Sequence, residues 1–534
     1  MPDILPIHQY ITNDLFRQAV GLLDAGRVAA LAAHLDQYPS LLSETASFSE
    51  TFFISGTQPG QYFEAPKLLW FVAENPIRNR AFPENIIDII QCIIDHQRKH
   101  SDDTLQHDLY KTLTLATSGN VSRETGMQGA LVNVLVKNGA DPNCAEAALA
   151  HGEHHAVQAL LDAGAEVNLL IAAGLGFIED LERLLPDADA DTRQKALSCA
   201  ANCSQPTACR ILIDNGVDPS QYNPQGFHAH CTPVHSAVET GSYETVTTLV
   251  SRGGDTTIKD RIHDSDALGW AQHLEYDSII ELIEFARRYM PIVEAVKARD
   301  IGMLRDLLDE HPDLVNATIG DNPRTLLHFA TDGNVIIDDG EVVRLLIASG
   351  ANVHARFSGP HEETPLHWAA SIDHTRAIDA LLDAGADIDA GGAVIGGGTA
   401  LTDAVVFCRW NAAQRLVDRG AAYDVWHAAA MGDLDKVKIM FDVNGTLHED
   451  SPRLPNTHDW GEKELINGAF WMACRRDLNT AQYLHMRGAD VNAVLYTGDA
   501  PLDVARIAGQ ARIEAWLLSL DAKSSSELIK GDVL

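Results

Sequence analysis

The chain has 534 residues, of which 46% are hydrophobic and 6% aromatic, and this length is too great for one ordinary globular core. Its 75 acidic residues outnumber its 40 basic residues and give a formal net charge of −35. A surface that acidic repels phosphate backbones and anionic lipids, so we expect neither nucleic acid nor membrane as a partner, and the charge indicates either solubility alone or a partner with a basic surface.

The N-terminal part of the chain is predicted to consist of helix pairs. Residues 20–42 (VGLLDAGRVAALAAHLDQYPSLL) predict two helices followed by a loop, and residues 68–73 (LLWFVA) predict the first helix of another pair. Residues 131–143 (LVNVLVKNGADPN) and 160–168 (LLDAGAEVN) each keep only the end of such a pair. These similar segments indicate that the chain contains an internal structural repeat.

Better-preserved units follow. Residues 232–258 (TPVHSAVETGSYETVTTLVSRGGDTTI) predict a complete helix pair, and residues 266–285 (DALGWAQHLEYDSIIELIEF) predict the next. The second of these parallels residues 499–518 (DAPLDVARIAGQARIEAWLL) near the end of the chain. Because terminal units cap a stack of repeats, this parallel predicts two tandem arrays, joined near residues 287–291.

The second half of the chain repeats the pattern. The predicted helical units are residues 296–315, 325–353, 364–389 (TPLHWAASIDHTRAIDALLDAGADID), 425–441 and 478–492. The glycines that end the second helices give the period, since Gly350, Gly385 and Gly420 are separated by 35 residues each. The spacing indicates one unit per 35 residues in this region.

The unit at residues 364–389 shows why each position needs its residue. Thr364 can cap the first helix, and Pro365 suits its first position, where a missing N–H costs nothing. Leu381 is expected to bury the second helix, and Gly385 to end it in the left-handed conformation.

These features resemble the ankyrin repeat, a turn-helix-helix unit of about 33 residues with a T-P-L-H-x-A signature. The long loop NPQGFHAHCTPVH at residues 223–235 resembles the fingers of bacterial multi-repeat ankyrin proteins. The resemblance implies an all-α ankyrin solenoid in two tandem arrays. We expect a first array with degenerate N-terminal units at 1–287, a second array at 288–521 and a flexible tail at 522–534. It also implies protein binding, as a scaffold, adaptor or inhibitor, and no reaction.

The cysteines and the N-terminus indicate the compartment. Eight cysteines are scattered without a closely spaced framework, which favours reduced thiols in a cytosol-like environment. The N-terminal residues show no basic segment followed by an apolar core, and no run of 18 apolar residues occurs. We therefore expect a cytoplasmic protein, although delivery into a host cell as an effector is a further alternative.

Several residue groups could carry chemistry, and each has a simpler interpretation. The glycine run at residues 391–398 lacks the lysine of a phosphate loop and lies where a finger belongs. His228, His230 and Cys231, with His235, have zinc-binding side chains, but their spacing matches no zinc pattern. The close cysteines at 199, 203 and 209 are more typical of buried hydrophobic residues. We expect no metal and no cofactor.

No catalytic motif occurs, and the histidines have a structural explanation. His235, His328, His367 and His427 all occupy the signature position, which the family uses for a hydrogen bond to the backbone. We therefore expect no enzyme activity. The alternative is an unrecognised hydrolase or metal-dependent enzyme with its site in a loop insertion, which tightly bound zinc or a closed pocket of carboxyl groups with shifted pKa would favour.

The residue after the signature histidine is expected to point to the concave face. It is aromatic at Phe71, Trp270, Phe329 and Trp368. The finger residues expected along the edge of this face are Phe227, His228, His361 and Glu362. Large aromatic side chains are typical of interfaces, so these eight residues are the predicted partner-binding site. The competing interpretation is that the rings pack over alanines of neighbouring units.

Overall fold

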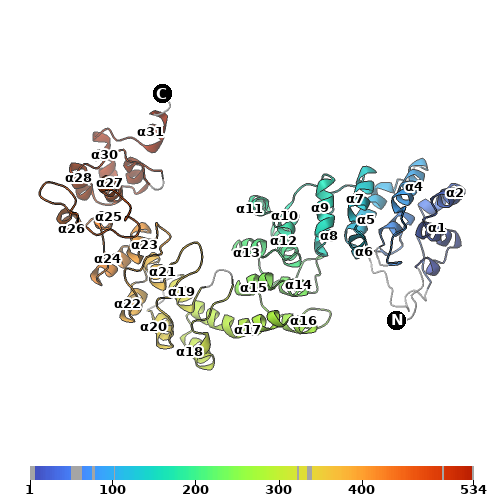
Figure 1. Ribbon diagram of the computed structural model, residues 1–534, viewed down its shortest axis with the longest axis horizontal. Helices are drawn as coiled ribbons and strands as arrows, with labels where there is room; N and C mark the ends of the chain where they lie inside the picture. Colours follow the sequence, from blue (N-terminus) through green and yellow to red (C-terminus); the bar gives the residue numbers. More distant parts are fainter. Residues whose placement is uncertain are drawn as a thin grey trace. The chain divides into compact units, whose positions relative to one another are not determined.

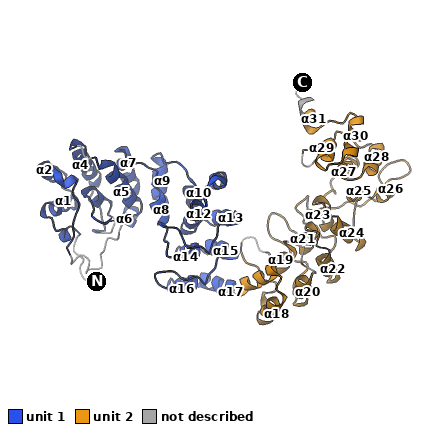
Figure 2. Ribbon diagram, turned by 180° about the vertical axis from the view of Figure 1, so that it is seen from behind, with its two compact units in different colours: residues 1–286 blue, residues 287–534 orange. Residues whose placement is uncertain are grey.

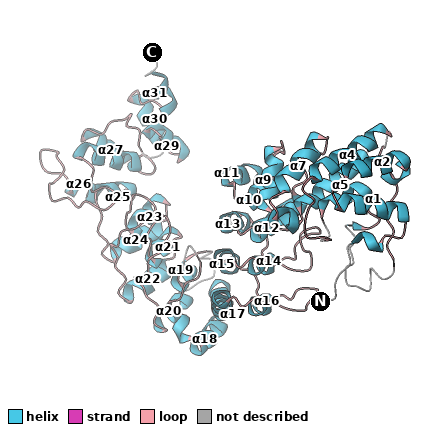
Figure 3. Cartoon of the chain, turned by 45° about the vertical axis from the view of Figure 1, so that its right-hand side comes forward, coloured by secondary structure: helices cyan, strands magenta, loops and turns pink. Residues whose placement is uncertain are grey.

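The chain folds into helices joined by turns and loops. The computed structural model describes residues 7–49, 63–74, 78–100, 103–320, 324–333, 340–495 and 498–531. Helices and loops make up these residues, which contain isolated β-bridges but no β-strand (Figure 3). The prediction of an all-α fold is confirmed.

The chain divides into two compact units, residues 1–286 and 287–534 (Figure 2). The boundary falls within α17 (Asp277–Ala298), which contains Pro291. The assignment of one predicted ankyrin array to each unit, with limits at 1–287 and 288–521, stays a prediction.

Unit 1 is built from two layers of helices (Figure 1). The first helices of successive pairs pack on one another: α1 (Asp14–Asp24), η4 (Leu68–Ala73), α5 (Leu105–Thr117), α8 (Glu146–Ala150), α10 (Leu169–Leu175), α12 (Ala190–Asn202), α14 (Pro233–Glu239) and α16 (Ala267–His273). The second helices are α2 (Val28–Gln37), α4 (Ile86–Lys99), α7 (Gln128–Lys137), α9 (His154–Asp162), α11 (Ile178–Leu184), α13 (Pro206–Asp214) and α15 (Tyr243–Ser251). Short helices complete the unit: η1 (Ile7–Tyr10), η2 (Pro39–Leu42), α6 (Asn120–Glu124) and η5 (Leu185–Asp187).

Unit 2 has the same two layers. Its first helices are α19 (Leu326–Thr331), α21 (Pro365–Ser371), α23 (Ala400–Val406), α25 (Val425–Ala430), α27 (Glu462–Ala473) and α29 (Pro501–Ile507), and each packs on the next. Its second helices are α18 (Ile301–Glu310), α20 (Glu341–Ala348), α22 (Thr375–Asp383), α24 (Trp410–Asp418), α26 (Leu434–Ile439), α28 (Leu478–Met486) and α30 (Ala511–Ser519). Two further helices are η6 (Pro312–Leu314) and α31 (Ser525–Gly531). We call the surface of the first helices in either unit its first-helix face.

The best-preserved unit folds as its residues predict. Thr364 caps α21, Pro365 occupies its first turn, and α22 buries Leu381 completely. Gly385 follows α22 with φ of +88°, the left-handed conformation expected of it. Helix capping, leucine burial and the terminating glycine therefore act together to fix this unit.

Part of the C-terminal segment at 522–534, for which flexibility stays a prediction, is helical. Residues 525–531 form α31, and the amide of Ser525 donates to Asp503 Oδ2 over 2.7 Å. The carboxylate of Glu527 also accepts from the amide of Ser524 at the start of the helix. These caps satisfy the first amides of a short helix, which explains the ordered turn. The last residues of the expected tail, 532–534, lie outside the described residues.

Candidate partner-binding surface

The signature threonine and histidine position the first-helix face. At the start of α21, His367 Nδ1 lies 3.1 Å from the amide of Thr364 and 2.9 Å from its hydroxyl oxygen. His367 Nε2 lies 3.3 Å from the carbonyl oxygen of Gly398 in the next finger. The imidazole thus joins one unit to its neighbour and fixes the direction of the following residue, Trp368.

The same arrangement recurs in other units. His235 lies against Thr232 and reaches the carbonyl oxygen of Ser265, and His328 lies against Thr325 and reaches that of Glu363. Burial lowers the pKa of His328 and of His367 to about 4, outweighing the bonds to the carbonyl oxygens, which act in the opposite direction. These imidazoles are neutral structural links, as the sequence predicts for the signature position.

Two of the predicted aromatic residues lie half-buried on the first-helix face of unit 2. Trp368 packs edge-on against His328, with ring centroids 5.1 Å apart, and against Phe357 at 5.5 Å. The guanidinium carbon of Arg324 lies 4.9 Å from the Trp368 ring centre and 5.9 Å from that of Phe329. Both rings are thus partly exposed, and each lies within cation–π distance of the Arg324 guanidinium group.

Trp270 lies in the equivalent place in unit 1. It is half-buried, packs against His235 with ring centroids 5.1 Å apart, and donates from Nε1 to Asp260 Oδ2 over 3.0 Å. It lines a groove of about 450 Å³ together with Glu239 and His263. Trp270 is thus held in place along one edge and open along another.

Two of the residues predicted to bind a partner, Phe71 and Phe227, are buried in the structure. Phe71 in η4 is 0% exposed and packs against Phe16 and Phe63, at ring-centroid distances of 6.0 and 5.3 Å. Every residue of η4 is buried, because this first helix lies under the preceding pair and the loop around Phe63. Phe227 is 3% exposed. Both rings belong to the core, and neither is available to a partner in this conformation.

The predicted finger residues are accessible to different degrees. His228 is half-buried with φ of +59°, and its Nε2 lies 2.8 Å from the carbonyl oxygen of Ala150, so the finger lies against the turn after α8. It lines a groove of about 400 Å³ that also contains His151 and Glu239. Glu239 therefore borders both grooves of unit 1. His228 and Trp270 lie on neighbouring grooves of one surface.

The finger before α21 brings His361 and Glu362 to the surface of unit 2. His361 is half-buried, and its Nδ1 lies 3.1 Å from Glu363 Oε2. Glu362 is exposed, while its carbonyl oxygen accepts a bond of 2.9 Å from Arg356. Glu362 is therefore exposed to solvent six residues before Trp368, and its role in partner binding stays a prediction.

The histidines and cysteines that could bind a metal have the environments of residues that stabilise the fold. In the part of the chain that the structure describes, no three His, Cys, Asp or Glu side chains are grouped so as to hold a metal ion. Cys199, Cys203 and Cys209 are buried, and burial raises the pKa of Cys203 to about 12, which disfavours the thiolate that binds metals. His230 lies between His228, which it meets edge-on, and Trp270, at centroid distances of 5.9 and 6.3 Å.

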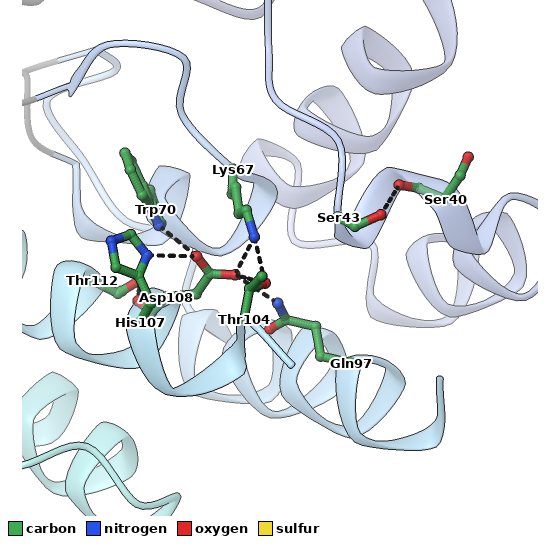
Figure 4. Close-up of polar contacts among 9 residues, drawn as sticks. All are labelled: Ser40, Ser43, Lys67, Trp70, Gln97, Thr104, His107, Asp108 and Thr112. Carbon is green, nitrogen blue, oxygen red and sulfur yellow. Dashed lines mark hydrogen bonds and ion pairs between the residues drawn. The ribbon is translucent and has the colours of Figure 1, made fainter. Parts of the chain in front are cut away.

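A buried polar network in unit 1 has the residue types of an active site but a structural geometry. The carboxylate of Asp108, which is fully buried, accepts bonds from Trp70 Nε1 at 3.2 Å and Gln97 Nε2 at 3.0 Å, and Lys67 Nζ lies 3.3 Å away (Figure 4). Thr104 donates to the same carboxylate over 3.2 Å. With its oxygens so occupied, Asp108 joins η4, α4 and α5 and has little capacity left for a substrate.

Sequence reasoning did not identify two further features. The first is the carboxyl pair of Glu363 and Asp403, which are 7% and 0% exposed. Burial, followed by the neighbouring carboxylate of Glu363, raises the pKa of Asp403 far above its usual range. Asp403 follows Thr402 in the unit TALTDA, so it occupies the same repeat position as Trp368, and alignment of that unit would have found it. The second feature is a groove between α23 and α29.

The structure and the family together define the class of protein. Stacked helix pairs joined by fingers, with a repeated capping box, make a helical repeat protein. The family of ankyrin repeats (3 copies) matches residues 169–260, 292–392 and 336–426. The chain therefore contains ankyrin repeats in both units, and repeat proteins of this kind present extended surfaces that bind other proteins.

Other comparisons add little. No curated protein matches the chain. A solved structure of a predatory endopeptidase from Bdellovibrio bacteriovorus in complex with an immunity protein is similar at 20% identity, over 43% of this chain and 97% of that chain, with a TM-score of 0.27. A likeness at that score has no bearing on function. Among the described helices, none combines the length and apolar character needed to cross a bilayer.

Proposed function

We propose that the chain is a non-enzymatic module that binds another protein on its first-helix face. The observation that carries the proposal is the repeated placement of Trp270, Phe329 and Trp368. All three follow a signature-type position, and all three are half-buried rather than enclosed. Aromatic rings that are rigidly held on one edge and open on the other are typical of the central residues of protein interfaces.

The finger residues extend this surface. In unit 1, His228 and Trp270 border grooves of about 400 and 450 Å³ that share Glu239. In unit 2, Glu362 is exposed in the finger that precedes Trp368. With a formal net charge of −35, the chain would steer a partner with a basic surface towards these rings. The rings would supply most of the binding energy, as scaffold, adaptor and inhibitor roles all require.

A hydrolytic role has weaker support. The carboxyl groups with the most enzyme-like environment, Glu363 and Asp403, are buried, and neither lines the grooves described for the two units. A substrate would have to reach carboxyl groups that are only 7% and 0% exposed. All eight cysteines are free, which fits the reducing conditions of a cytoplasm and the location that we propose.

Affinity capture with the full chain from the native organism, followed by titration of the identified partner, tests the proposal. Trp368→Ala is expected to weaken binding by about 2 kcal/mol, as truncation of interface tryptophans often does. Because the ring also packs on His328, the melting curve of the variant must be measured with its affinity. If the folded fraction binds as tightly as the original chain, the aromatic row only packs the repeats and the proposal is wrong.

A further inference from the structure

A groove of about 1080 Å³ crosses the first-helix face of unit 2 near its C-terminal end. It is lined by residues at the ends of α23, α27 and α29 and by the start of α24, together with the finger at residues 394–396. Its volume is at the upper limit of the roughly 300–1,000 Å³ usual for small-molecule sites, so the groove can accommodate a short peptide segment.

The walls of the groove expose apolar side chains that the fold does not cover. Ile507 is 77% exposed, Val394 is 54% exposed and Phe407 is 44% exposed. Beneath them, Trp471 and Met472 are 8% and 1% exposed and form the floor. Contiguous exposed apolar residues around a groove are uncommon on monomeric proteins and typical of binding surfaces.

Two guanidinium groups lie in the same groove. Arg475 Nη2 lies 3.0 Å from the Sγ atom of the exposed Cys408, and the guanidinium carbon of Arg476 lies 4.1 Å from the ring centre of Trp410. No carboxylate lies within 4.0 Å of either group among the residues that the structure describes, although the chain carries a formal net charge of −35. Asp499 also lines the groove, and its carbonyl oxygen accepts from Trp471 Nε1 over 3.0 Å.

We infer that this groove binds an acidic, apolar peptide segment of a partner protein, with its carboxylate on Arg475 and Arg476 and its apolar side chains against Phe407 and Ile507. The inference rests on the proposed protein-binding function and names a partner chemistry for one site. Charge complementarity selects this occupant, because paired guanidinium groups bind carboxylates and repel a basic segment. Arg475, Arg476 and Asp499 are the charged residues that line the groove, so its lining is net positive although the whole chain is acidic.

The test is a selection of surface-displayed random 12-residue peptides on the full chain. We expect the enriched peptides to combine Asp or Glu with neighbouring Leu, Ile, Phe or Trp. Binding of such a peptide, made synthetically, is expected to fall about tenfold or more in Arg475→Gln/Arg476→Gln, as loss of charge-assisted hydrogen bonds predicts. The bound peptide is also expected to slow the alkylation of Cys408 by iodoacetamide, which mass spectrometry measures. Cys408→Ser lacks this thiol and therefore identifies the signal that belongs to Cys408.

The matched control is Lys463→Gln/Arg512→Gln. Both residues are exposed in unit 2 and lie outside the groove, and the variant loses the same two positive charges. It should bind the peptide as the original chain does. Phe407→Ala and Ile507→Ala remove exposed apolar side chains, so they should weaken binding with little change in melting temperature.

Four results would overturn the inference: enrichment of basic peptides, no enrichment at all, equal loss in the control variant, or unprotected Cys408. Preferential binding of a second copy of this chain or of a single-stranded oligonucleotide would also contradict the named occupant. The experiments distinguish failure of this inference from failure of the proposed protein-binding function. A captured partner that depends on Trp368 but not on Arg475 and Arg476 leaves the protein-binding function standing and removes this site from it.

Discussion

Trp368 lies edge-on against His328, with ring centroids 5.1 Å apart and ring planes inclined by 73°. The pair Trp270 and His235 has the same geometry, 5.1 Å and 74°. In each case the signature histidine of one repeat supports the aromatic residue of the next. The ring that we propose for partner binding is therefore also part of the packing between repeats, and the two predicted roles of the aromatic row are combined in the same side chains.

The indole N–H groups distinguish the two tryptophans. Trp270 Nε1 donates to Asp260 Oδ2 over 3.0 Å, whereas the buried Nε1 of Trp368 has no hydrogen-bond partner in the described structure. We expect Trp270→Phe to lower the free energy of unfolding by about 1.5–3 kcal/mol, the contribution of a hydrogen bond to a charged group. Trp368→Phe should lower it by less, about 1 kcal/mol, because only ring area is lost. Urea denaturation of both variants measures the difference, and equal losses would contradict it.

Leu381 and Leu382 are neighbours on α22 in different environments. Leu381 is completely buried, and Leu382 is half-buried. Leu381→Ala is expected to cost about 2–5 kcal/mol in denaturant unfolding, as truncation of a buried leucine does. Leu382→Ala is the matched control, with the same atoms removed from the same helix, and should cost clearly less. A change at Leu381 below the error of the measurement would show that this face of α22 is not in the core.

Protonation of His367 is expected to weaken the fold at low pH. Burial lowers its pKa from 6.5 to about 4, so the unfolded chain takes up a proton first as the pH falls. The stability that depends on the neutral imidazole is complete above pH 6.5 and is lost between pH 6.5 and 4, by about 3 kcal/mol at most. Denaturation at pH 7 and 4.5 should show a weaker pH dependence in His367→Gln.

His354→Gln is the control for that measurement. His354 is exposed in the same unit, so its replacement should leave the pH dependence as it is in the original chain. If both variants keep the full pH dependence, His367 does not titrate as its environment indicates. The bond between His367 and the carbonyl oxygen of Gly398 would then contribute to stability without conferring pH sensitivity.

Sequence patterns spanning a few residues predicted the repeat well, but they could not predict how segments distant in sequence pack together. The cap at Thr364 and the left-handed Gly385 depend on residues a few positions away, so the sequence determines them directly. The burial of Phe71 depends on Phe16 and Phe63, and on a 3₁₀ helix where the pattern predicts an ordinary first helix. Arg475 and Arg476 were not identified, because the groove arises from helices distant in sequence.

The carboxyl pair of Glu363 and Asp403 predicts a different response to pH. Because burial and the neighbouring carboxylate raise the pKa of Asp403 far above 3.8, the folded chain holds a proton that the unfolded chain releases. The stability linked to that proton is complete below pH 3.8 and is lost as the pH rises, by at most about 1.4 kcal/mol per pH unit for one proton.

Asp403→Asn replaces the protonated acid with a neutral group of the same shape, so it should be more stable than the original chain, increasingly so from pH 5 to pH 8. Asp306→Asn, an exposed change of equal charge on α18, should show no such trend. Parallel denaturation curves for Asp403→Asn and the original chain across this range would mean that Asp403 is not protonated in the folded chain.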